Sequence, residues 1–96
     1  MSFINAFQKK YSCGYTFFHS LFPDALKLLQ DALIVLDRAI EKGDGSEWMR
    51  TMTAVKSIAE DMCFATISKK KFNMKKPNRK DYYILTACVN NIANLR

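Results

Sequence analysis

The chain has few of the residues that interrupt helices or build tight turns. It contains three glycines and two prolines in 96 residues. A chain made of many short strands needs frequent turns, and those turns rely on glycine and proline. Apolar residues make up 49% of the sequence, which suffices for a core without a metal or a disulfide. The composition therefore favours long helices in a single domain over residues 1–96.

The residues that build metal and catalytic sites are also scarce. There is one histidine, His19, and the three cysteines Cys13, Cys63 and Cys88 include no closely spaced pair. Zinc modules need such pairs, and an odd count does not fit a secreted disulfide framework. A nucleophile would have to lie beside His19, but Cys13 falls on a different side of a helix. We predict a non-enzymatic protein with no catalytic residue, no metal site and no cofactor.

Long hydrophobic runs are missing as well. The longest uninterrupted apolar run has five residues, Ala32 to Leu36, whereas a membrane-spanning helix needs about 20. Lys9 and Lys10 follow the first apolar residues, while a secretory signal places its cations before them. We expect a cytoplasmic protein without a membrane span, in which the three cysteines stay reduced.

Apolar residues nevertheless recur at helical spacing along most of the chain. In residues 3–22 they form one face, made of Ile4, Phe7, Tyr11, Tyr15, Phe18 and Phe22. Gly14 weakens this pattern, so we expect a bent or broken helix around residues 11–18. Pro23 has a fixed φ that suits a first helical turn, so it is predicted to end this helix and to begin the next.

The clearest pattern covers residues 23–42. Its main apolar stripe consists of Leu26, Leu29, Leu33, Leu36 and Ile40. A second stripe lies beside the first, which indicates a helix packed on two neighbours. Leu33 is at the middle of the main stripe and is predicted to be a core residue.

Two more helices follow. Gly43 is a good C-cap, and Asp44 or Ser46 is predicted to cap a helix that runs to about residue 68. Pro77 and Asn78 mark the start of a last helix, whose inward face is Leu85, Cys88, Ile92 and Leu95. Short connections favour antiparallel neighbours. The predicted fold is all-α: a compact antiparallel four-helix bundle with a bent or broken first helix and a basic loop before the last one.

The net charge of +6 is concentrated in residues 69–80. This segment holds seven of the 15 Lys/Arg residues and no acid, while the rest of the chain carries eight cations against nine acids. Clustered like charge is unfavourable unless an anionic partner neutralises it. A solvated loop after a helix C-terminus is the simplest alternative, because cations there interact favourably with the helix dipole. Three lysines would be enough for that purpose, so this alternative does not account for all seven cations.

We therefore predict that this segment binds the acidic surface of a larger protein, as in a regulator, an inhibitor or an immunity-type protein. The predicted partner-binding residues are Lys69, Lys70, Lys71, Phe72, Met74, Lys75, Lys76, Arg79, Lys80 and Tyr82. The alternative is non-specific nucleic-acid binding, with lysines on phosphates and Phe72, Tyr82 and Tyr83 stacking on bases. Lysine outnumbers arginine six to one in the segment, which argues against reading of base edges. A nuclear-import signal is a further use of such a run.

Overall fold

The computed structural model describes residues 15–94, with side chains from Ser20 onward. The helices are α2 (Tyr15–Lys42), α3 (Gly45–Asp61), α4 (Ala65–Ser68) and α5 (Arg79–Asn94). No strand occurs within this part of the chain, so the all-α prediction is confirmed for it. Most of the helix face predicted over residues 3–22, together with Gly14, Cys13 and Leu95, lies outside the described residues or among side chains that are not described.

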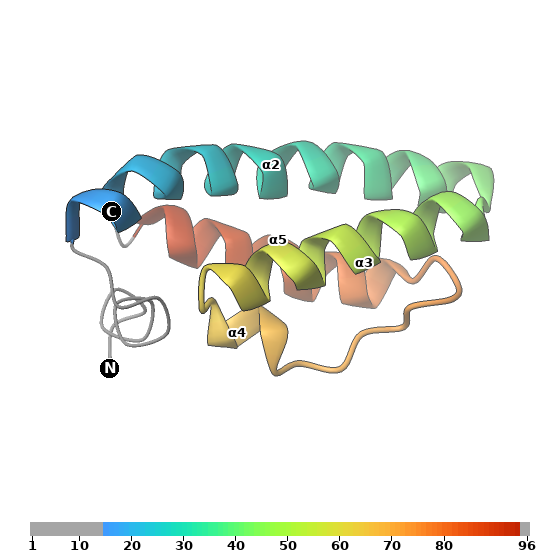
Figure 1. Ribbon diagram of the computed structural model, residues 1–96. Coiled ribbons are helices and arrows are strands. Elements are labelled where there is room, and N and C mark those ends of the chain that lie inside the picture. The colour runs from blue at the N-terminus through green and yellow to red at the C-terminus, as the bar shows by residue number, and fades with distance from the viewer. Residues whose placement is uncertain (1–14, 95–96) are drawn as a thin grey trace.

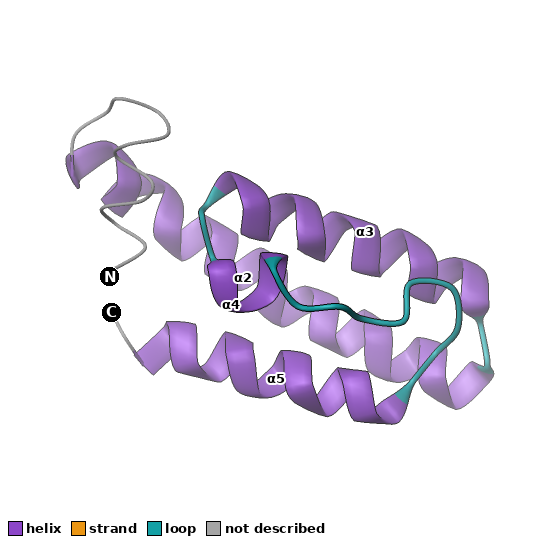
Figure 2. Ribbon diagram, turned by 90° about the horizontal axis from the view of Figure 1, so that it is seen from below, coloured by secondary structure: helices purple, strands orange, loops and turns teal. Residues whose placement is uncertain are grey.

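The long helices α3 and α5 both pack against α2 and run in the opposite direction to it (Figure 1). The single turn of α4 lies between α3 and α5 and contacts both (Figure 2). The described residues thus form three long helices and one helix of four residues. The core fills the space between α2 on one side and α3, α4 and α5 on the other.

Pro23 does not separate two helices, which corrects the prediction from the sequence. It is the ninth residue of α2, which continues through it without interruption. A proline there removes one main-chain hydrogen bond and crowds the carbonyl four residues earlier. Burial offsets this cost, because Phe22 and Ala25 on either side of Pro23 are both buried. The Phe22 ring also meets Phe64 edge to face, with the ring centroids 5.8 Å apart.

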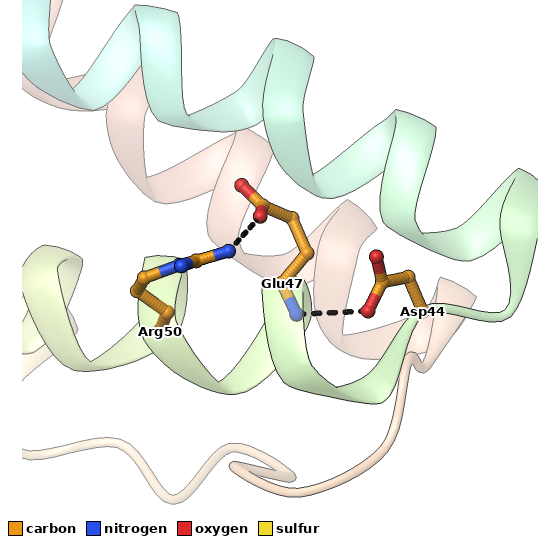
Figure 3. Close-up of polar contacts among 3 residues, drawn as sticks. All are labelled: Asp44, Glu47 and Arg50. Carbon is orange, nitrogen blue, oxygen red and sulfur yellow. Dashed lines mark hydrogen bonds and ion pairs between the residues drawn. The ribbon is translucent and has the colours of Figure 1, made fainter.

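The turn between α2 and α3 follows the predicted signals. Gly43 has a φ of 65°, and its N–H donates to the carbonyl of Ile40, while the Asp44 N–H donates to that of Ala39. This pair of bonds ends α2 in a Schellman motif. The Asp44 side chain then caps α3 by accepting from the Glu47 N–H at 3.1 Å (Figure 3). The other half of a capping box does not form, since the Asp44 N–H already donates to Ala39 and the Glu47 carboxylate pairs with Arg50.

The helix predicted to run to about residue 68 is broken after Asp61. Cys63 has a φ of 59°, in the left-handed region, and the Phe64 N–H donates back to the carbonyl of Ala59 at 2.8 Å. The break turns Phe64 into the core, where it is 1% exposed. A new turn, α4, then begins at Ala65. Burial of a large aromatic side chain outweighs the cost of the left-handed residue.

The main apolar stripe predicted on α2 faces the core, but Leu33, the residue predicted at its middle, is not the most buried member. Leu29 and Leu36 are fully buried, whereas Leu33 is only partly buried and packs against the edge of the core. On the facing helices the fully buried side chains include Trp48, Met52, Phe64, Ile67 and Leu85. Cys88 is buried and Cys63 partly buried, both as free thiols.

Candidate functional site

The basic segment is a loop that connects α4 to α5, as the sequence predicted. Its first ten residues, 69–78, are outside any helix, and Arg79 and Lys80 begin α5. The loop does not extend away from the protein. It runs alongside α3 and returns toward the N-terminal end of that helix before it enters α5 (Figure 2).

Lys56 of α3 holds the beginning of this loop. Its ammonium donates to the main-chain oxygens of Ser68 at 2.7 Å and Lys70 at 2.8 Å, with a longer contact to Ile67. These carbonyls stand where α4 ends, and the last carbonyls of a helix lack intrahelical partners. A lysine of the neighbouring helix therefore satisfies them and fixes the direction in which the loop leaves α4.

The middle of the loop is held at Asn73. The indole N–H of Trp48 donates to the main-chain oxygen of Asn73 at 2.6 Å. The main-chain N–H of Asn73 donates to the Asp81 carboxylate at 2.6 Å. The Asn73 side-chain oxygen accepts from the N–H groups of Lys75 and Lys76, which closes a local turn. One loop residue is thus tied to α3, to α5 and to its own neighbours.

Next to this turn the loop passes closely over the start of α3. A Cβ placed on Gly45 would lie 3.2 Å from the main-chain oxygen of Lys75. A larger residue at position 45 would therefore press against the loop backbone, so the absence of a side chain there permits the close approach.

The end of the loop joins α5 through a capped helix start. The Asn78 side chain accepts from the Asp81 N–H at 3.1 Å, which fits the start predicted at Pro77 and Asn78. Arg79 reaches across to α2 and pairs with Asp37 at 2.6 Å. This hydrogen bond raises the pKa of Arg79 above its ordinary value. Its charge also lies 5.3 Å from the centre of the Tyr82 ring.

The ten predicted partner-binding residues fall into two groups. The exposed ones are Lys69, Lys70, Lys71, Lys75, Lys76 and Lys80. The partly buried ones are Phe72, Met74, Arg79 and Tyr82. Of the latter, the three apolar or aromatic side chains pack against the core. They therefore have a structural role whether or not they also contact a partner. Tyr83, in contrast, is 63% exposed.

A groove of about 560 Å³ separates the first part of the loop from α3. The helix contributes one wall, made of Thr53, Lys56, Ser57 and Glu60. The loop contributes the other, made of Lys70, Lys71, Phe72 and Met74. All four loop residues were predicted to bind a partner, the lysines as cations and Phe72 and Met74 as apolar anchors beside them. The helix wall was not, because nothing in the spacing of its polar residues indicates that a later segment returns over them.

Residues 15–94 include no group of three or more histidine, cysteine or acidic side chains placed to bind a metal ion. Among the same residues, none of the helices has the length and apolar character required to cross a bilayer. Comparison of the chain with protein-family models, curated proteins and solved structures finds no match.

Proposed function

We propose that this protein is a small, non-enzymatic, cytoplasmic binding module that docks on the acidic surface of a larger protein through residues 69–80. A regulator, an inhibitor or an immunity-type protein would act in this way. For the whole chain we propose a compact antiparallel four-helix bundle. The observation that supports the docking role is the fixed course of the basic loop, which Lys56, Trp48 and Asp81 hold by hydrogen bonds while six lysines remain exposed.

A loop held in this way is suited to recognition. A flexible lysine-rich loop would lose conformational entropy on binding, whereas a loop that is already ordered loses less. Lysines that are not needed to stabilise the loop keep their charges free for an acidic partner. Complementary charge accelerates encounter and excludes partners of the wrong sign.

The positions of Phe72 and Tyr82 favour a protein partner over a nucleic acid. Stacking on bases needs ring faces that are open to solvent. Of the three rings predicted to stack on bases, Tyr83 is exposed. Phe72 and Tyr82 are partly buried against the core, and the cations of Lys56 and Arg79 lie over them. Rings placed in this way fit the edge of a protein interface, where apolar anchors are surrounded by charge.

The test is a variant in which Lys69, Lys70, Lys71, Lys75 and Lys76 are replaced by Gln. A partner is first captured from native lysate with and without nuclease, then purified and titrated against both proteins. We expect the variant to fold normally, since exposed charges change stability by less than about 0.5 kcal/mol each, and to bind much more weakly. A control variant removes three exposed cations outside the loop, Lys27, Arg38 and Lys42, by replacement with Gln and should bind like the wild type.

A salt series separates the two kinds of partner. Binding to phosphates through about six contacts loses on the order of 10³-fold in affinity between about 50 and 200 mM salt. A mixed apolar and charged protein interface loses much less. If the five-lysine variant folds and binds the purified partner as tightly as the wild type at every salt concentration, the proposal is wrong.

A further inference from the structure

The groove between α3 and the loop combines an apolar floor with a cationic rim. Phe72 and Met74 each pack one side against the core and line the groove with another. Lys70 and Lys71 are exposed at its edge. The groove has a volume of about 560 Å³ and is widely open to solvent. It leaves room for a large side chain of another protein.

The charges in the groove are unequal. Three ammonium groups, those of Lys56, Lys70 and Lys71, face one carboxylate, that of Glu60. The Lys56 ammonium is held by the carbonyls of Ser68 and Lys70 and lies 5.9 Å from the centre of the Phe72 ring. Its charge is therefore a fixed part of the groove. Lys70 and Lys71 are the cations that a bound segment would reach from solvent.

We propose that this groove binds an acidic peptide segment of the partner protein, with one large apolar side chain seated on Phe72 and Met74. Carboxylates next to that side chain pair with Lys70 and Lys71. The inference rests on the proposed function and narrows it to the first half of the basic loop. Methionine is unbranched and polarizable, so Met74 can adapt to aliphatic or aromatic side chains.

The chain supplies a matched control. Lys75 and Lys76 belong to the same loop and are equally exposed, but they do not line the groove. Lys70→Gln/Lys71→Gln and Lys75→Gln/Lys76→Gln remove the same charge from the protein. A difference between the two variants therefore reports on the groove and not on the overall charge of the loop.

The probe is a synthetic peptide of aspartate and glutamate with one central leucine, together with versions that carry phenylalanine or serine at that position. Each is titrated into full-length protein labelled with ¹³C in the methionine methyl groups. Met74 lines the groove, whereas Met52 and Met62 are buried in the core and serve as internal references. We expect a saturable shift of the Met74 methyl signal with the leucine and phenylalanine peptides, and a much smaller one with the serine peptide.

The variants are expected to differ in their affinity for the leucine peptide. Lys70→Gln/Lys71→Gln should reduce the affinity for the leucine peptide by about fivefold or more, since two exposed ion pairs contribute up to about 1 kcal/mol each. Lys75→Gln/Lys76→Gln should have a clearly smaller effect. Glu60→Gln removes the carboxylate from the groove wall and should tighten binding by about two- to fivefold on the same grounds.

Each contrary result has a distinct meaning. Suppose that both double-lysine variants lose the same affinity and that the leucine peptide binds no better than the serine peptide. This result would overturn the proposed groove site while leaving the basic loop as the docking surface. No Met74 shift with any peptide would also overturn it. If neither pair of lysines affects binding of the purified partner either, the proposed function fails together with the groove.

Discussion

The indole nitrogen of Trp48 donates a hydrogen bond to the main-chain oxygen of Asn73, 2.6 Å away and 25 residues further along the chain. Trp48 is the single tryptophan of the protein, and its side chain is fully buried. A buried indole N–H needs an acceptor, because leaving it unpaired is costly. The acceptor here belongs to the basic loop. The same hydrogen bond therefore satisfies a buried donor in the core and fixes the position of the candidate binding surface.

Replacing Trp48 by Phe should therefore affect the loop more than an ordinary core substitution does. We expect a loss of about 1–3 kcal/mol in stability, from the missing hydrogen bond and the smaller ring. Amide exchange between residues 70 and 76 should accelerate beyond what that global loss explains. Leu85→Ala, in the core of α5, is the control and should accelerate exchange throughout the protein. Unchanged loop exchange in Trp48→Phe would show that the loop is held by other contacts.

Lys56 is expected to act on the start of the loop. Lys56→Met keeps the length of the side chain but removes the ammonium that the carbonyls of Ser68 and Lys70 accept from. We expect faster trypsin cleavage at Lys69 to Lys71 and a loss of about 1.5–3 kcal/mol in stability, as for a hydrogen bond to a charged group. The control Lys27→Met removes an exposed lysine of α2 and should change neither property. Equal cleavage rates in both variants would contradict the anchoring role.

Local signals in the sequence predicted the parts of the fold that depend on local chemistry. Gly43 and Asp44 mark the turn between α2 and α3 because a left-handed glycine and a side-chain cap each act within a few residues. Pro77 and Asn78 mark the start of α5 for the same reason. The helical periodicity of residues 23–42 identified the core helix and its inward face, on which Leu29 and Leu36 are buried and Leu33 is partly buried.

Features that depend on distant contacts could not be predicted in this way. The break at Cys63 carries no glycine or proline and is explained only by the burial of Phe64. The charge of the loop was evident, but its return over α3 depends on Lys56 and Trp48, which lie at unremarkable positions in the sequence. The α3 wall of the groove was missed because a polar helix face reads as solvent-exposed until another segment covers it.

The continuity of α2 through Pro23 can be tested by Pro23→Ala. Inside a helix, proline is about 3 kcal/mol less favourable than alanine, whereas at the first helical position it costs little. In the structure the new N–H of residue 23 would be able to donate within α2. We therefore expect Pro23→Ala to raise the free energy of unfolding by about 1–3 kcal/mol in denaturant titrations. Unchanged or reduced stability would support a helix that begins at Pro23.

The centre of the core can be tested by truncating two leucines of the same helix. Leu36 is 0% exposed, whereas Leu33 is only partly buried. Leu36→Ala should cost about 2–5 kcal/mol, and Leu33→Ala should cost clearly less because its site is already open to water on one side. Denaturant melts of the two variants measure this difference directly. A larger loss for Leu33→Ala would centre the inward face of α2 on Leu33 and not on Leu36.

The left-handed backbone at Cys63 determines whether glycine or alanine is the more stable substitution there. In a continuous helix, alanine is more stable than glycine by about 1 kcal/mol. At a left-handed residue the order reverses, since a Cβ costs about 1–2 kcal/mol there and glycine avoids that cost. Both substitutions remove the thiol, so the stability lost with its packing is the same in both variants and does not affect their comparison. With Cys63 at a φ of 59°, we expect Cys63→Gly to unfold at higher denaturant concentration than Cys63→Ala. The opposite order would mean that α3 continues through residue 63, as its sequence pattern alone suggests.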